Sequence, residues 1–339
     1  KQIPVSLALH DTPILLGICL YGLGVLSCFW SSMPALSFAF AFQISMFIWI
    51  LFYLMGYSKE FCTTEKYLIR LLIIMLLFSM LRKPINYRII PTISYFLSFH
   101  ELQAGGISAA LFSYCIAERT APHSKLNPQR GRLLTRSAIF AFLVLIISTS
   151  SGSNVSVLVA ILVLAVVRHR WYMSFAVFMC LSVAILYPQI IDNAIAIIFP
   201  GKSMHRITNI GSRTMLWYDM WMLFKQKPIL GWGFATIERM GTVYASDAHN
   251  AFIGILGGLG LVGTGLFVTF ISCTLIRMYK LRNQIGYMGL LCATVCMVVN
   301  SNTYGFLSSK TYMLTITFFA MMSCGYWYKF KLSPTIIDP

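Results

Sequence analysis

Charged residues are scarce in this chain of 339 residues, and acidic residues are the scarcest of them. Only 11% of the residues are charged, while 58% are hydrophobic and form repeated apolar runs. This composition excludes a soluble domain of similar length and indicates an integral membrane protein. The 26 Lys and Arg against 10 Asp and Glu give a net charge of +16. Because the basic residues lie mostly in short loops between apolar runs, they indicate membrane orientation and no nucleic-acid partner.

The sequence also lacks clustered carboxylates and paired cysteines. No D-x-D motif occurs among the ten acidic residues, although carboxylates are what hold a hard cation against phosphate. The nine cysteines are scattered and lie mostly inside apolar runs. Cys292 and Cys296 share a helical face, but no second pair completes a zinc site or a disulfide framework. We therefore expect neither a metal ion nor any other cofactor.

The apolar runs predict an all-α, polytopic transmembrane protein. A span needs about 20 apolar residues, or fewer where the helix is short or broken. About ten runs meet this criterion, near 13–30, 33–56, 67–81, 103–118, 137–150, 154–167, 171–187, 250–273, 286–304 and 312–328. We expect an N-terminal bundle at 1–199, an extracytoplasmic loop at 200–249 and C-terminal helices at 250–339, all joined in one membrane domain.

The basic residues predict which loops face the cytoplasm. Lys and Arg recur at every second boundary between spans, at positions 59–66, 119–136, 168–170, 277–282 and 329–331. By the positive-inside rule these loops are cytoplasmic, and the segments 82–102, 150–154, 200–249 and 305–311 lie on the opposite side. We interpret the basic cluster from Lys125 to Arg136 as a solvated topology loop rather than a lipid-headgroup or nucleic-acid site.

One polar interruption, residues 211–263, stands out among the apolar runs. Its first part predicts an amphipathic helix from Ser212 to Gln226 at the membrane interface, because apolar and aromatic residues recur there at helical spacing. Arg213 lies in the first turn, where free backbone N–H groups and a guanidinium together suit a phosphate. The sequence P-x-x-G-x-G from Pro228 to Gly233 then predicts a sharp turn.

His249 and Asn250 stand where the next apolar run begins. Six glycines follow, which would let a neighbouring helix approach closely; they occupy positions 254, 257, 258, 260, 263 and 265. His249 is either a capping or interfacial histidine or a base. As a base it would accept a proton from a sugar hydroxyl, with Asn250 or Asp247 orienting it or the acceptor.

These residues resemble the C-terminal module of O-antigen polymerases and O-antigen ligases. The resemblance rests on R-x-x-x-W at Arg213 and Trp217, on P-x-x-G-x-G after a lysine, and on H-N at His249 with a glycine-rich run behind it. The matching motifs cover residues 211–265, and the order of the spans around them agrees with the family.

The resemblance implies a GT-C-like glycosyltransferase in a bacterial inner membrane, with its active site on the periplasmic or extracytoplasmic face. Its donor would be an undecaprenyl-diphosphate-linked oligosaccharide, and its acceptor a glycan hydroxyl. In this family the motif arginine binds the diphosphate and the histidine serves the acceptor, which carries over to Arg213 and His249. Trp217, Asn250 and Asp247 would support them in a metal-independent, inverting displacement. The lipid bilayer and assembly proteins such as a chain-length regulator are the other expected partners.

The sequence departs from the family at one position. Members often carry a further arginine upstream in an S-R-G or T-R-A context, and the nearest equivalent here, residues 149–156, contains no arginine. By predicted sidedness, Arg206, Arg88 and Arg239 are the candidates for a second diphosphate ligand. Arg206 ranks first because it precedes the Arg213 helix, and the alternative is that it is an ordinary loop residue.

Alternatives to this assignment concern the base, the acceptor and the activity. Glu101 or Glu238 could act as the base in place of His249. A polymerase uses a lipid-linked repeat as acceptor and a ligase uses lipid A core; only 35 residues separate Arg213 from His249, which leaves little room for a core-binding loop and favours a polymerase. A transporter or flippase predicts charges deep in several spans, and only Arg70 stands out there.

Overall fold

The computed structural model describes residues 12–56, 61–85, 101–121, 127–148, 150–168, 212–240, 248–308 and 312–332. Within these residues every regular element is a helix and none is a strand, which confirms the all-α class. Four of the described helices are long and apolar enough to cross a membrane: α2 (Thr12–Leu26), α3 (Pro34–Gly56), α7 (Pro128–Ser148) and α13 (Ala251–Lys280).

Further helices lie at most of the other predicted spans. Among the described residues these are α4 (Phe61–Ile85), α6 (Glu101–Arg119), α8 (Ser151–Val167), α14 (Tyr287–Asn300) and α15 (Met313–Leu332). The predicted span 171–187 lies outside the described residues. The chain is therefore a helical membrane protein, while the count of about ten spans and the GT-C-like arrangement stay predictions.

The helices form two compact units whose segments alternate along the chain. The first unit comprises residues 1–68, 211–281 and 301–339, and it contains α2, α3, α12 (Ser212–Gln226), α13 and α15. The second unit comprises residues 69–210 and 282–300, and it contains most of α4 with α6, α7, α8 and α14.

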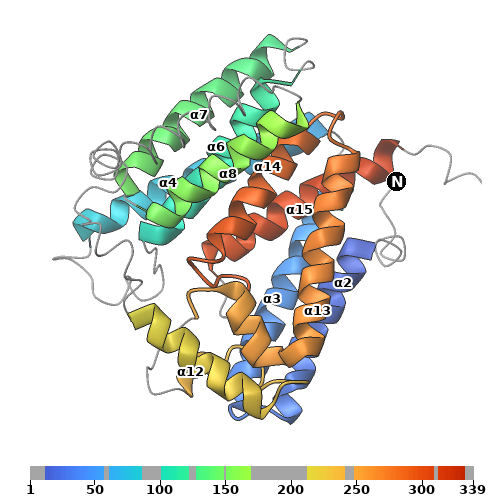
Figure 1. The fold of residues 1–339 in the computed structure, drawn as a ribbon. Helices are drawn as coiled ribbons and strands as arrows, with labels where there is room; N and C mark the ends of the chain where they lie inside the picture. Colours follow the sequence, from blue (N-terminus) through green and yellow to red (C-terminus); the bar gives the residue numbers. More distant parts are fainter. Residues whose placement is uncertain are drawn as a thin grey trace, which may run out of the picture. The chain divides into compact units, whose positions relative to one another are not determined.

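In the second unit α6 packs against α7, α8 and α14 (Figure 1). The approach is close at Gly105, where an added Cβ would lie 2.6 Å from the Cβ of Ser150. Small residues allow such contacts between membrane helices. Ser150 and Ser153 share a hydrogen bond of 2.8 Å beside this glycine, at the point where the start of α8 meets α6.

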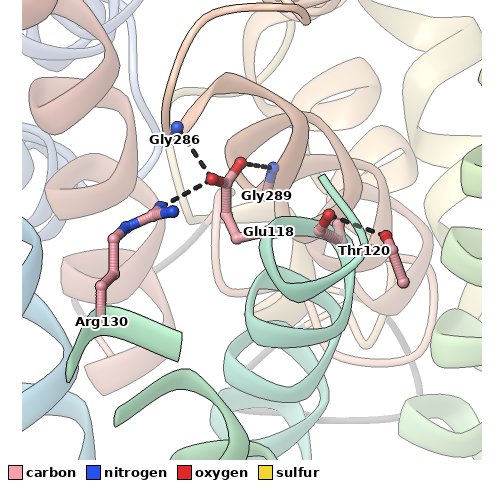
Figure 2. Close-up of polar contacts among 6 residues, drawn as sticks. Glu118, Thr120, Arg130, Gly286 and Gly289 are labelled. Atoms are coloured by element: carbon pink, nitrogen blue, oxygen red, sulfur yellow. Dashed lines mark hydrogen bonds and ion pairs between the residues drawn. The ribbon is translucent and has the colours of Figure 1, made fainter. Parts of the chain in front are cut away.

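A buried ion pair fixes the opposite end of α6 (Figure 2). Glu118 is fully buried, and its Oε2 accepts hydrogen bonds from Arg130 Nη2 at 2.7 Å and from the Gly286 backbone N–H at 3.0 Å. Its Oε1 accepts from the Gly289 N–H at 2.8 Å. Gly286 and Gly289 lie at the start of α14, where backbone N–H groups lack partners within the helix and favour a negative charge. One carboxylate therefore joins α6, α7 and α14.

The interpretation of the basic cluster as solvated is wrong for Arg130. Arg130 is 7% exposed and lies in α7, which begins at Pro128, nine residues before the predicted span at 137. Arg132 and Arg136 on the same helix are exposed, as expected. The difference arises because Glu118 supplies a counter-charge across the α6–α7 connection, and a charge count along the chain does not contain that pairing.

In the first unit α2 packs against α3 and α13, and α3 packs against α15. Tyr21 of α2 is at the centre of this packing, with ring centroids 5.7 Å from Phe319 and 6.0 Å from Phe234. Its hydroxyl donates to the Leu307 carbonyl at 3.1 Å. A buried tyrosine needs such a partner for its hydroxyl, and this bond fixes the 301–308 segment to α2.

Helix α13 is broken at Gly260, where φ is 64° and ψ is −160°. A broken turn deprives neighbouring backbone groups of their partners within the helix, and buried groups of this kind must be paired elsewhere. Here the segment Pro228–Gly233 supplies the partners. Four backbone hydrogen bonds join them: Trp232 N to Gly257 O at 3.1 Å, Gly233 N to Gly258 O at 2.8 Å, Leu261 N to Pro228 O at 2.8 Å, and Val262 N to Ile229 O at 3.3 Å.

Glycines in the segment Pro228–Gly233 and in α13 are needed for this insertion. Gly231 has a φ of +66°, and an added Cβ there would lie 2.5 Å from the Gly258 carbonyl oxygen. The sequence predicted that the glycine-rich run would admit a neighbouring helix; in the structure it also admits the turn segment Pro228–Gly233 after α12. The opposite edge of that segment is tied to the α2–α3 connection by Ser32 N to Trp232 O at 3.2 Å and Phe234 N to Ser27 Oγ at 2.9 Å.

We expect the Glu118→Gln substitution to lower the free energy of unfolding by roughly 3 kcal/mol, because Arg130 would stay buried without its counter-charge. Thermal unfolding of the detergent-solubilised protein measures the loss. Arg119→Gln is the matched control, since Arg119 is the next residue and is exposed, and its effect should stay within about 0.5 kcal/mol. Equal stability of the two variants would contradict the structural role of the ion pair.

We expect the Gly231→Ala substitution to destabilise the protein by more than about 2 kcal/mol, because the residue has a left-handed backbone and lies against Gly258. Gly265→Ala is the control: its Cβ would meet no atom within 4 Å, and alanine favours a helix by up to about 1 kcal/mol over glycine. The same unfolding measurement checks both. A Gly231→Ala protein as stable as wild type would rule out the tight insertion.

Candidate functional site

Helix α12 extends from Ser212 to Gln226, as the sequence predicted. It uses one face to pack against α13 (Figure 1). Leu216 and Met220 on this face are buried in a cluster with Ile237 and Ala248. Arg213 is half-buried and stands one helical turn before Trp217. Residues four apart share a helix face, so Arg213 continues the face that packs toward Ala248.

Trp217 connects α12 to the residue that precedes His249. Its indole Nε1 donates to the Ala248 carbonyl at 2.9 Å, and the ring packs against the cluster that contains Ala248. Ala248 is fully buried. The segments that carry the motif arginine and histidine, which are 36 positions apart in the sequence, are therefore held together by one packed cluster of the first unit.

The backbone around His249 is fixed on both sides. Asn250 is the N-cap of α13, and its Oδ1 accepts from the N–H groups of Phe252 at 2.9 Å and Ile253 at 3.2 Å. The next N–H, that of Ala251, donates to the Ser301 carbonyl at 2.9 Å. With Ala248 held by Trp217, little freedom is left to the residue between them. Asparagine at an N-cap is a strongly preferred choice.

His249 itself has a left-handed backbone, with a φ of +51°. Such a conformation is uncommon for residues other than glycine, although histidine adopts it more often than most. The side chain is half-buried and its Nδ1 atom is shielded from solvent. Non-glycine residues in this region concentrate at functional sites when the surroundings hold them there, and the contacts of Ala248, Asn250 and Ala251 provide that hold.

Arg239 and Glu238 lie in the short helix η3 (Ile237–Arg239), which packs against both α12 and α13. Arg239 Nη1 donates to the Ala235 carbonyl at 2.6 Å, and its guanidinium carbon lies 5.6 Å from the ring centroid of Phe40. Glu238 is fully buried, a setting that suits a structural carboxylate better than a base that meets substrate.

Some predicted residues lie outside the described part of the chain. These are Arg88, Arg206 and Asp247, and Glu101 is described only by its backbone, as the first residue of α6. Among the described residues no group of three or more His, Cys, Asp or Glu could hold a metal ion. Of the other predicted residues, Trp217 contacts the residue before His249 and Asn250 caps α13, while Arg213 lies one turn before Trp217 and Arg239 lies in the short helix that packs against α12.

Sequence reasoning missed the backbone contacts that hold this site. Nothing in the local pattern indicates that the carbonyls of Ala248 and Ser301 accept hydrogen bonds from distant segments. The capping role of Asn250 had a usable signal, since asparagine directly before an apolar helical run is an N-cap pattern. No sequence signal indicated the positive φ of His249 or of Ala235.

Comparison with known proteins gives one match. The family model described as O-antigen ligase matches residues 137–268, a range that includes most of α7, all of α8 and α12, and the part of α13 that contains the break at Gly260. No curated protein and no solved structure matches the chain. The match contains Arg213, Trp217 and His249 and confirms the resemblance that their motifs indicated. The chain is thus a helical membrane protein whose residues 137–268 are similar to the O-antigen ligase family.

Proposed function

We propose that this protein is a membrane glycosyltransferase that moves glycan from an undecaprenyl-diphosphate carrier to a sugar hydroxyl. The observation that carries the proposal is the contact of Trp217 with Ala248, which fixes the Arg213 helix against the backbone that bears His249. A permanent cation on one segment and an imidazole on the segment packed against it are suited to an anionic leaving group and a hydroxyl nucleophile. The O-antigen ligase family of the matched domain supports the same class of reaction.

Arg213 and a second cation would bind the diphosphate. Arg213 lies in the first turn of α12, where backbone N–H groups add to the guanidinium charge. Arg239 gains support as the second ligand, because Ile237 of the same short helix packs in the cluster with Leu216 and Ala248. Arg206 and Arg88 remain candidates from the sequence. Each charge-assisted hydrogen bond to the diphosphate would contribute about 1.5–3 kcal/mol.

His249 would act as the general base. It takes the proton from the acceptor hydroxyl, whose oxygen attacks the anomeric carbon of the donor sugar. The bond from that carbon to the diphosphate oxygen breaks, and undecaprenyl diphosphate leaves with the developing negative charge stabilised by arginine. A single displacement inverts the anomeric carbon. The cap at Asn250 and the bond at Ala248 hold the backbone on both sides of His249, which limits the reorganisation needed during the reaction.

We place this reaction on the extracytoplasmic side of a bacterial inner membrane. The proposal rests on the positive-inside rule and gains support from the packing. In the first unit the α2–α3 connection, the 228–240 segment and the start of α13 lie together, and the sequence assigns the 228–240 segment to the side opposite the basic loops. The basic end of α13, with Arg277 and Lys280, is the other end of that helix.

The acceptor decides between a polymerase and a ligase. The short interval between Arg213 and His249 favours a polymerase, which joins one lipid-linked repeat to another. The description of the matched family favours a ligase, which joins the glycan to lipid A core. We propose polymerase activity, with ligase as the second candidate.

We expect purified protein in lipid to extend a synthetic undecaprenyl-diphosphate repeat into a ladder of products, without added metal. The Arg213→Ala protein is the negative control, since it keeps the fold elements but lacks the diphosphate cation. Lipid A core is supplied in a parallel reaction. A ladder supports the polymerase, and a single transfer that requires core supports the ligase. If neither occurs while the carrier crosses the bilayer, the protein is a transporter and the proposed function is wrong.

We expect the His249→Ala substitution to lower the transfer rate by about 10²- to 10⁴-fold, because a positioned base contributes that much. The apparent affinity for the donor should change little, since the arginines are intact. Trp217→Phe is the comparison: it keeps an aromatic ring but loses the N–H that donates to Ala248. This substitution should lower the transfer rate by about tenfold or less. Rates come from single-turnover assays. If the His249→Ala protein transfers glycan at the wild-type rate, His249 is not the base and another group has that role.

A further inference from the structure

We propose that the outward face of α12 and the turn after it lie in the membrane interface as a lipid-binding surface. This face, here called the interfacial face, consists of the apolar residues on the side of α12 away from α13 and of the two residues that follow Pro228. Its members are Met215, Tyr218, Trp221, Met222, Ile229 and Leu230, which are 41% to 64% exposed. The inference concerns a surface separate from the proposed reaction and does not depend on it.

Composition argues against water as the environment of this face. The sequence predicted an amphipathic helix, and its apolar residues Leu216 and Met220 are buried against the protein. Met215, in contrast, is 64% exposed on the other side. A helix that is apolar on both sides is covered by protein or by lipid. With 15 residues α12 is about 22 Å long, too short to cross the bilayer core of about 30 Å.

The interfacial face is continuous with the lipid-facing stripe of a membrane helix. The carbonyls of Pro228 and Ile229 accept from the N–H groups of Leu261 and Val262, so the turn lies directly against the break in α13. Leu261 and Val262 are 57% and 43% exposed, and exposed apolar residues continue along α13 at Val268 and Ile276. Before the break, in contrast, no residue of α13 is exposed.

The length of α13 after Gly260 indicates how deep in the bilayer the turn at Ile229 and Leu230 lies. The 20 residues from Leu261 to Lys280 span about 30 Å, which equals the thickness of the hydrocarbon core. Arg277 and Lys280 occupy one end of this half-helix. The other end, at Leu261, is then level with the opposite interface, and Ile229 and Leu230 lie at that same level.

The lysines and aromatic residues of this region have the arrangement that is typical of a membrane–water interface. Trp and Tyr are enriched where a membrane meets water, because the ring is apolar and one end is polar. Lys225 Nζ lies 5.7 Å from the Trp221 ring centroid, and Lys227 Nζ lies 4.0 Å from that of Trp232. Lysines at the end of such a helix can extend toward lipid phosphates while their stems remain on apolar surface. The occupant is therefore a lipid surface with its phosphates near Lys225 and Lys227.

Quenching of Trp221 fluorescence tests this proposal in lipid nanodiscs made with brominated phospholipids. The fluorescence of Trp221 is obtained by subtracting the signal of the Trp221→Phe protein from that of wild type. This substitution keeps an aromatic ring beside Phe224. We expect bromine near the glycerol end of the acyl chain to quench it at least about twofold more than bromine at the chain end or iodide in water. Trp232→Phe is the matched control, because Trp232 is half-buried and its Nε1 donates to the Leu223 carbonyl. Its contribution should be quenched less.

Each other outcome overturns the proposal. Quenching of Trp221 by iodide without quenching by bromolipid means that the face meets water and is available to a glycan or a protein. Strongest quenching at the chain end means that α12 is buried in hydrocarbon. No quenching by either agent means that protein covers the face, such as a second copy of the chain. Tyr218→Trp in the Trp221→Phe protein gives a second reporter on the same face and must agree with the first.

Discussion

The exchange of backbone hydrogen bonds at Gly260 is the interaction on which the arrangement of the site depends. Two peptide N–H groups and two carbonyls of α13 would pair with each other in an unbroken helix, and in an apolar environment they cannot stay unpaired. They pair instead with the segment Pro228–Gly233. This pairing anchors the chain directly after α12, so the helix that bears Arg213 is fixed to the helix that begins after His249.

Several local features that look unrelated serve this one exchange. Pro228 lacks an N–H, but only its carbonyl is used in the insertion, as acceptor for Leu261. Gly231 provides the left-handed turn and the space against Gly258. Trp217, Asn250 and the Ser301 carbonyl then hold the backbone around His249, whose own conformation is unfavourable in isolation. The candidate site is thus a rigid one, held by backbone pairing and by one packed cluster, and rigid support is what a charged and proton-accepting pair requires.

The second unit pairs its buried N–H groups with a side chain instead of with another backbone segment. There a single buried carboxylate, Glu118, pairs with Arg130 and with the free N–H groups at the start of α14. A buried charge is costly unless it is paired and hydrogen-bonded, and here each oxygen has at least one donor. The scarcity of acidic residues noted in the sequence makes this one conspicuous: Glu118 serves packing among helices, whereas we propose that the motif residues of the first unit serve chemistry.

The sequence by itself determined the features that depend on composition and local spacing. The all-α class, the membrane setting, the bounds of α12 and the turn from Pro228 to Gly233 follow from apolar periodicity and from the backbone restrictions of proline and glycine. The motifs around Arg213 and His249 also sufficed to indicate the family that residues 137–268 match. Only the tertiary structure decided which segments pair: the break of α13, the insertion that fills it, the ion pair of Arg130 with Glu118, and the left-handed backbone of His249. These depend on contacts between residues far apart in the chain, and a local pattern constrains what a segment can form but not which distant segment will supply its missing partner.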